Sequence, residues 1–156
     1  MYKRQFKNRV WSLRHLKRNG FTKPDLVKVY AAMVRPVAEY CSSVFHTLIT
    51  ASDSHEFERI QMQALKSIFG WRLSYRALLE RSGLERLDER RKARFLCLAD
   101  KMSKSSRYAS WFPLRLYRNN VGIRHEERYK IYWSSSERYL DSPLNAMRRE
   151  LNKALE

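Results

Sequence analysis

The stretch TKPDLVKVYAAMVRPVAEYCSSVFH, from Thr22 to His46, decides the fold that the sequence predicts. Apolar side chains recur along it every three to four residues, which is the spacing of a helix that buries one stripe. Thr22 and Asp25 form an S/T-x-x-D capping box at its start, and Pro24 occupies the first turn, where a proline costs no hydrogen bond. We therefore predict helical structure over residues 23–46.

Pro36 conflicts with a regular helix. A proline inside a helix costs about 3 kcal/mol and here removes the hydrogen bond to the Ala32 carbonyl. The apolar period nevertheless continues beyond Pro36. We therefore predict a kinked central helix, or two helices that meet near Arg35, rather than a helix end.

The remaining chain reads as helices joined by short loops. Helical patterns cover residues 3–19, 53–69, 74–83, 88–103 and 143–155, and four glycines and four prolines are too few for a strand-and-turn fold. The prediction is an all-α fold, an irregular bundle of five to six helices with a less regular aromatic segment near 105–141. We place a helical domain at 1–104 and a C-terminal extension at 105–156.

Three side-chain expectations follow from these patterns. Cys41 and Cys97 fall on apolar helical faces, so both are expected to be buried, reduced thiols. Gln61 is expected to be a solvated helix former, with contact to a sugar or phosphate as the alternative. In the aromatic segment, side chains either fill the gap between helices or stack on bases. The aromatic residues concerned are Trp111, Phe112, Tyr132 and Trp133.

The charge is strongly one-sided. Lysine and arginine number 32 against 16 acidic residues, which gives a net charge of +16 and favours polyanionic partners. No acidic side chain precedes Asp25, so the cations of the first helix have no partner within that helix. They indicate either a surface that follows phosphates or the solvated face of a basic protein. The hydrophobic content of 44% is sufficient for a folded core.

The phosphate-binding interpretation names twelve residues. The first group comprises Lys3, Arg4, Lys7, Arg9, Arg14, Lys17 and Arg18, and the second comprises Arg59, Lys66, Arg90, Arg91 and Arg94. If five or six cations of the first helix contact phosphates, the logarithm of the binding constant should fall with log salt at a slope of roughly −5. No groove-reading motif is present, so we expect no sequence specificity.

Four segments resemble one family when taken in order. They are residues 16–46, ERIQMQALKSIFG at 58–70, SYRALLERSGLERLDERRKARFLCLADKM at 74–102 and ERYLDSPLNAMRRELN at 137–152. The set is similar to the thumb and post-palm region of non-LTR (LINE-type) retrotransposon reverse transcriptases, which are RNA-directed DNA polymerases. The resemblance implies contact with RNA, DNA or their hybrid, and with the palm domain of a polymerase. It further implies a fragment whose Met1 falls inside an ancestral reading frame.

The sequence argues against catalysis by this chain alone. Polymerases of the resembled family hold two metal ions on paired palm aspartates, whereas no two aspartates here are adjacent. Cys41, His46 and His55 do not have zinc-site spacing, and no phosphate-binding glycine loop is present. We expect no cofactor, no metal and no small-molecule substrate.

Location follows from the same patterns. No apolar run is long enough to span a membrane. The basic, amphipathic start resembles a mitochondrial transit peptide, but the family pattern continues through it. We expect an intracellular protein, nuclear or cytoplasmic.

The sequence is therefore compatible with two functions. The first is a non-catalytic, thumb-like segment that binds nucleic-acid backbones. The alternative is a free-standing basic helical protein that docks within a ribonucleoprotein complex through an exposed apolar patch. The candidate patch residues are Val10, Trp11, Val44 and Phe45.

Overall fold

The computed structural model describes residues 2–114 and 128–154, with side chains from Arg4 onward. Lys3, one of the predicted phosphate contacts, therefore lies outside the described side chains. The all-α prediction is confirmed for the described residues, where the only β pairing is an isolated bridge between Leu114 and Tyr129. The chain forms two compact units, and the division inside α7 after Arg91 differs from the predicted boundary at residue 104.

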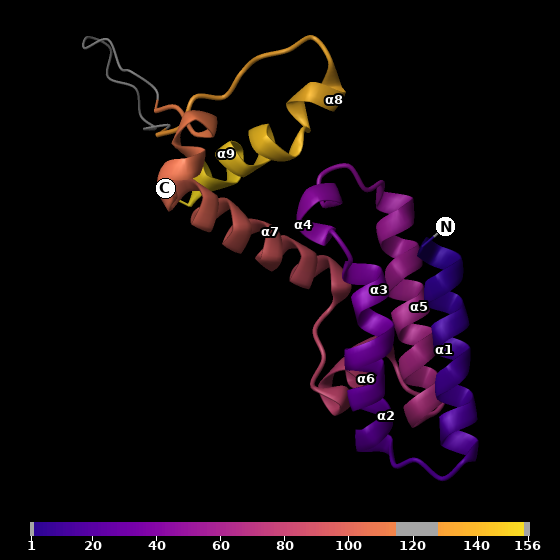
Figure 1. Cartoon of the computed structure of the whole chain (residues 1–156). Helices are drawn as coiled ribbons and strands as arrows, with labels where there is room; N and C mark the ends of the chain where they lie inside the picture. Colours follow the sequence, from indigo (N-terminus) through magenta and orange to yellow (C-terminus); the bar gives the residue numbers. More distant parts are fainter. Residues whose placement is uncertain (1, 115–127, 155–156) are drawn as a thin grey trace. The chain divides into compact units, whose positions relative to one another are not determined.

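Unit 1 spans residues 1–42 and 49–91. Its elements are α1 (Tyr2–Arg18), α2 (Lys23–Val29), the π-helix η1 (Tyr30–Val34), α3 (Arg35–Glu39), α5 (Ala51–Phe69), α6 (Tyr75–Ser82) and the first residues of α7 (Leu87–Lys104). Figure 1 shows α1 and α5 side by side and running in the same direction, with α2, η1 and α3 beside them in the opposite direction. More helices are present than predicted because the central segment is divided.

The core of unit 1 lies between these helices. Its largest fully buried apolar side chains come from α1, α2, η1, α5, α6 and the start of α7, and they include Phe6, Leu13, Leu26, Tyr30, Ile60, Leu65, Ile68, Leu78 and Leu87. The predicted helix starts are confirmed at Thr22, Thr50 and Ser74, whose hydroxyl oxygens accept backbone N–H groups three residues later. Gly83 ends α6 with φ +64°, a conformation that favours glycine.

The central helix is interrupted before Pro36. Residues Tyr30–Val34 form a π-helix, and the Arg35 N–H donates to the Tyr30 carbonyl five residues earlier. Pro36 has no N–H to give to Ala32, and its ring crowds the preceding turn, so the backbone widens there. The predicted irregularity is present, as a π-helical turn rather than a helix break.

Beyond α3 the sequence prediction is wrong. α3 ends at Glu39, and Cys41 has a positive φ of 52°, so the helix that we expected to continue to residue 46 is broken there and only the short helix Ser42–Phe45 follows. Cys41 is exposed, and so is Cys97, in contrast to the buried thiols expected. In α7 the buried stripe is Phe95 and Ala99, offset from the predicted Cys97 position.

A polar network crosses the interior of unit 1. The Tyr30 hydroxyl donates to Gln61 Oε1 at 2.6 Å, and Gln61 Nε2 donates to the Tyr75 hydroxyl at 2.9 Å and to the Glu85 carbonyl at 3.0 Å. The Tyr75 hydroxyl donates to Glu58. Burial raises the pKa of Tyr30 and of Tyr75 above the usual value, because a phenolate is poorly solvated there. Gln61 is fully buried, so the prediction that it is solvated is wrong.

Unit 2 spans residues 43–48 and 92–156. Its elements are most of α4 (Ser42–Phe45), the rest of α7, the 3-10 helix η2 (Ser106–Trp111), α8 (Glu137–Leu140) and α9 (Pro143–Lys153). Its core joins Phe95 and Ala99 of α7 to Phe112, Tyr129 and Met147. Polar side chains of α9 hold the irregular segment, because Arg148 donates to the Trp111 carbonyl and Asn152 bonds to both backbone groups of Tyr129.

Replacing Asn152 with leucine should destabilise unit 2 by about 2–4 kcal/mol. The amide accepts from the Tyr129 N–H at 2.9 Å and donates to the Tyr129 carbonyl at 3.0 Å, and both backbone groups are left unpaired by the change. Thermal unfolding followed by circular dichroism measures the loss. Asn152→Asp keeps the acceptor for the Tyr129 N–H but places a second carboxylate oxygen against the Tyr129 carbonyl, so it should also be less stable than the wild type. Equal stability of all three proteins would contradict this role.

Candidate nucleic-acid interface

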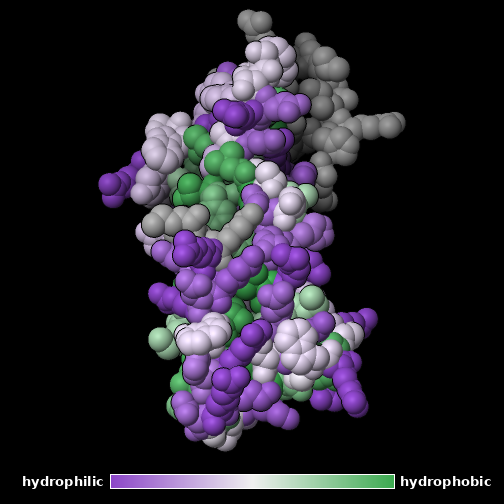
Figure 2. Space-filling model, turned by 90° about the vertical axis from the view of Figure 1, so that its right-hand side faces the viewer, coloured by the Kyte–Doolittle hydropathy of each residue, from purple (hydrophilic) through white to green (hydrophobic). Residues whose placement is uncertain are grey.

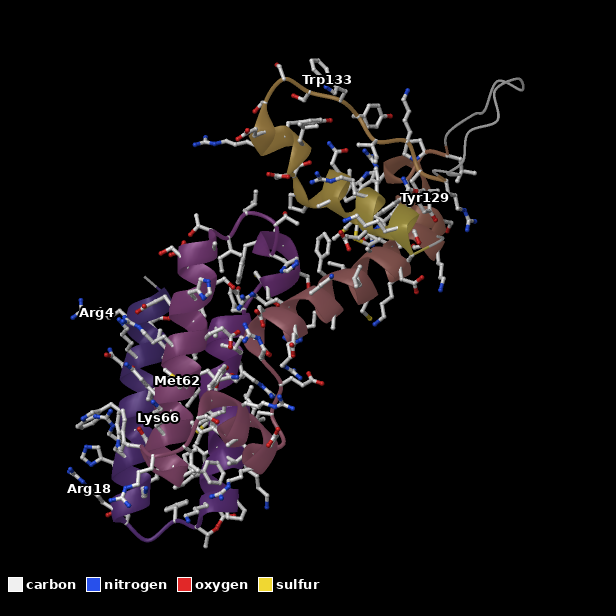
Figure 3. The ribbon with its side chains drawn as sticks, turned by 180° about the vertical axis from the view of Figure 1, so that it is seen from behind. Arg4, Arg18, Met62, Lys66, Tyr129 and Trp133 are labelled. Atoms are coloured by element: carbon white, nitrogen blue, oxygen red, sulfur yellow. The ribbon has the colours of Figure 1, made fainter. Side chains whose placement is uncertain are left out.

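The predicted cations that share one surface of unit 1 come from α1 and α5. We call Arg4, Arg14, Lys17 and Arg18 of α1, together with Lys66 of α5, the α1–α5 basic face. Figure 3 shows Arg4 and Arg18 toward the two ends of α1, with Lys66 on the neighbouring helix between them. Fourteen residues separate Arg4 from Arg18, which is about 21 Å of helix. In Figure 2, hydrophilic side chains cover most of unit 1 on the face shown.

Two predicted cations share one carboxylate, which offsets one of their two positive charges. Glu56 of α5 contacts Lys7 Nζ at 2.9 Å and an Arg59 guanidinium nitrogen at 2.7 Å. The hydrogen bond from Lys7, followed by that from Arg59, lowers the pKa of Glu56 below its usual range, so this carboxylate stays ionised. Lys7 and Arg59 therefore add less positive field than their number suggests. Arg9 points elsewhere and donates to the Met33 carbonyl at 2.7 Å.

Lys17 and Arg14 connect α1 to the end of α5. Lys17 Nζ donates to the Ser67 carbonyl at 2.7 Å and to the Ile68 carbonyl at 3.1 Å, which satisfies two acceptors that the helix end leaves open. Arg14 Nε donates to the Ser67 hydroxyl at 3.4 Å. Within the described part of the chain, the terminal guanidinium nitrogens of Arg14 remain available to another acceptor. Lys17 is thus largely a structural contact.

Arg90 and Arg91 are structural residues. Arg90 Nε lies 2.7 Å from a carboxylate oxygen of Glu39, and this hydrogen bond raises the pKa of Arg90. Arg91 is only 1% exposed, donates to the Ser54 hydroxyl at 2.6 Å and stacks its guanidinium over Phe57. Because Arg91 is buried and its charge lies near the carboxylates of Glu58, Asp88 and Glu39, its side chain is not presented to phosphate as the sequence predicted.

Arg90 and Arg94 also fall outside the basic face. Arg90 is half-buried and already paired with Glu39, so its charge is not presented to a phosphate. Arg94 is exposed but belongs to unit 2. The structure therefore brings together five of the twelve predicted residues on one surface.

Trp71 is a feature of this surface that the sequence prediction omitted. Gly70 ends α5 with φ +115°, and Trp71 follows with its side chain 62% exposed. The indole lines an open hollow of about 430 Å³. The other lining residues are Arg14, Lys17, Arg18 and Ser67. The sequence did contain a signal for this exposure. Trp71 follows a helix-ending glycine and does not belong to the apolar stripe of any predicted helix.

The aromatic segment of unit 2 divides between core and surface. Phe112 is 4% exposed and packs edge-on against Tyr129, as expected for a residue that fills a gap between helices. Trp133 is 84% exposed, and Figure 3 shows it extending from the segment before α8. Tyr132 is partly covered by the Arg148 guanidinium, 4.9 Å from its ring centroid. Only Phe112 among the four predicted residues is a core side chain.

Comparison with known proteins returned no match to a family model, a curated protein or a solved structure. Among the described residues, no three histidine, cysteine, aspartate or glutamate side chains gather as a metal site would require. None of the helices in residues 2–114 and 128–154 combines the length and the apolar character that crossing a bilayer requires. The candidate site therefore rests on its own geometry.

Proposed function

We propose that this chain binds the sugar–phosphate backbone of RNA, DNA or an RNA–DNA hybrid through the α1–α5 basic face, without reading sequence. The observation that carries the proposal is the acid-free helix α1, which presents Arg4, Arg14 and Arg18 to solvent beside Lys66 of α5. Among the described residues, none of these four cations forms a salt bridge with a carboxylate. Such cations attract a polyanion and release its counterions on contact.

The dimensions of the face suit a nucleic-acid strand. Successive phosphates of one duplex strand are about 3.4 Å apart along the axis, so the roughly 21 Å from Arg4 to Arg18 passes about six of them. Arginine binds phosphate oxygens through paired N–H groups, and three of these four cations are arginines. Contacts of this kind hold a strand by its charge but do not fix its register, so the strand can still slide.

The thumb-like interpretation is part of this proposal. The ordered blocks between residues 16 and 152 resemble the thumb and post-palm region of non-LTR reverse transcriptases, and an all-α unit with a basic face is compatible with that role. A thumb holds a primer–template while the strand advances, which requires backbone contacts rather than base contacts. The sequence lacks the paired aspartates of a palm, so the proposed function is binding without nucleotide transfer.

A salt titration tests the proposal. Four free cations should give a slope of log binding constant against log salt of about −3.6 on duplex and about −2.8 on single strands. This is shallower than the roughly −5 expected from the sequence, because Lys7, Arg9 and Lys17 have protein partners. Fluorescence anisotropy with labelled oligonucleotides of unrelated sequence measures both slopes. Affinity that is independent of salt, or that differs strongly between sequences, would overturn the proposal.

One observation favours the alternative, a helical protein that docks on another protein. A hollow of about 620 Å³ lies between α1 and the α2–η1 segment, with Trp11 and Met33 each 59% exposed beside it. An amphipathic partner helix buries its apolar face in such a groove. Of the predicted patch residues, Val10 is buried and Trp11 is exposed. If this is the main function, the isolated chain should not retain oligonucleotides at low salt.

A further inference from the structure

Trp71 is exposed beside the cations at the carboxyl end of α1. Its side chain is 62% accessible although it is large and apolar, and Lys66 Nζ lies 5.9 Å from its ring centroid. The backbone explains the placement, since Gly70 closes α5 with its N–H on the Lys66 carbonyl and turns the chain with φ +115°. An L-amino acid with a side chain would be strained at Gly70, so this turn fixes where the indole projects.

The hollow beside Trp71 combines an aromatic ring with positive charge. Arg14, Lys17 and Arg18 line its wall with Ser67, and none of its lining residues in the described part of the chain is acidic. Arg14 has its terminal guanidinium nitrogens free within the described part of the chain, while Lys66 adds a further cation next to the ring. A volume of about 430 Å³ lies within the range of about 300–1,000 Å³ that small-ligand sites occupy.

The chemistry of the hollow matches an unpaired nucleotide. Aromatic side chains stack on bases of any sequence, and neighbouring cations hold the phosphates on either side. A base within a duplex has both faces covered by its neighbours, so a protein ring can stack only on an unpaired or terminal base. Phosphate alone would need the arginines but would gain nothing from the exposed indole.

We infer that Trp71 and its hollow form a single-strand subsite, in which one unpaired base stacks on the indole while Arg14 and Arg18 bind adjacent phosphates. The inference rests on the proposed function and deepens it, because it adds a preference for unpaired strands to backbone binding. The hollow is open to solvent, which suits a nucleotide within a strand rather than an enclosed metabolite.

Trp71→Ala should weaken binding of a single-stranded oligothymidylate of about twelve nucleotides by about 5- to 150-fold. Binding of a duplex of the same length should be nearly unchanged. The slope against log salt should stay the same, because the substitution removes no charge. Anisotropy with the full chain measures all three quantities. Trp133→Ala is the matched control, because Trp133 is also an exposed tryptophan, at 84%, but belongs to unit 2 rather than to the unit that carries the basic face.

A second variant separates direct stacking from an indirect effect. Trp71→Phe keeps an aromatic ring and should retain most of the single-strand affinity. It should also abolish the quenching of intrinsic tryptophan fluorescence that the oligonucleotide causes in the wild type, although three tryptophans remain in the chain. Persistent quenching in Trp71→Phe would show that the base stacks elsewhere.

The outcomes distinguish this inference from the proposed function. If Trp71→Ala binds single strands as well as the wild type does, or loses affinity for single strand and duplex equally, the subsite is overturned while backbone binding stands. If the wild-type chain binds neither probe at low salt, the proposed function fails and the subsite fails with it. Selective loss on single strands, together with loss of quenching in Trp71→Phe, supports the subsite.

Discussion

Reversing Arg4, Arg14 and Arg18 to glutamate should lower affinity for duplex nucleic acid by about 500-fold at about 0.1 M salt. Each phosphate contact contributes about 0.9 to the slope, so three contacts contribute about 2.7 logarithmic units at that salt concentration. For single strands, the smaller contribution of about 0.7 each gives a loss of about 100-fold. The salt slope on duplex should become shallower, from about −3.6 to about −1.

The control for this variant is a protein with equal net charge. Each reversal removes two positive charges, so the triple variant falls from +16 to +10. Reversing Lys28, Arg76 and Arg81 has the same effect on net charge at exposed positions outside the basic face. This control should lose only a small part of its affinity, because distant charges are screened over about 10 Å at 0.1 M salt. Equal losses in both variants would mean that the whole protein's charge, rather than this face, attracts the strand.

Folding should be preserved in the triple variant. Arg4, Arg14 and Arg18 are exposed, and within the described residues the only side-chain hydrogen bond of the three is the 3.4 Å contact from Arg14 to Ser67. Exposed substitutions of this kind usually change stability by less than about 0.5 kcal/mol. Circular dichroism and thermal unfolding check this. Unchanged oligonucleotide affinity in a folded triple variant would contradict binding through the α1–α5 basic face.

Gln61→Leu should destabilise unit 1 by about 2–5 kcal/mol. Leucine has a similar size but offers no hydrogen bond, so the Tyr30 hydroxyl and the Glu85 carbonyl both lose a buried partner. This loss is a large fraction of the roughly 5–15 kcal/mol that stabilises a typical domain. The midpoint of urea denaturation, followed by circular dichroism, measures the effect.

Gln63→Leu provides the comparison for Gln61→Leu. Gln63 lies two residues away on the same helix and is half-buried, with no recorded side-chain hydrogen bond in the described part of the chain. Its replacement should change stability by about 0.5 kcal/mol or less. Tyr30→Phe should fall between the two, because it leaves only Gln61 Oε1 without its donor. A Gln61→Leu protein that unfolds at the wild-type urea concentration would show that the buried amide contributes little.

Local signals were sufficient to predict much of the fold. Thr22, Thr50 and Ser74 cap helices because their hydroxyl oxygens accept N–H groups only three residues away, and a sequence displays that spacing directly. Pro36 likewise acts on its own preceding turn. Gln61 and Arg91 were misassigned because their partners come from other elements. A polar residue on a helix looks solvated until the helices packed around it are known.

The candidate site shows the same limit. Net charge and the absence of acids before Asp25 indicated α1, but Glu56 lies far along the chain and its pairing with Lys7 depends on how α1 meets α5. The cysteine predictions failed for a related reason. We predicted Cys41 on the apolar stripe of a continuous helix, but that helix ends at Glu39. The period of an apolar pattern does not indicate where a helix ends.

The shared direction of α1 and α5 has an electrostatic consequence. A helix carries roughly half a negative charge at its carboxyl end and half a positive charge at its amino end. Two such ends coincide beside Arg14, Lys17 and Arg18, so about one unit of their charge is offset by the protein's own backbone. At the other end, the macrodipoles reinforce Arg4. A polyanion is therefore attracted more evenly along α1 than the number of cations at each end of the α1–α5 basic face implies.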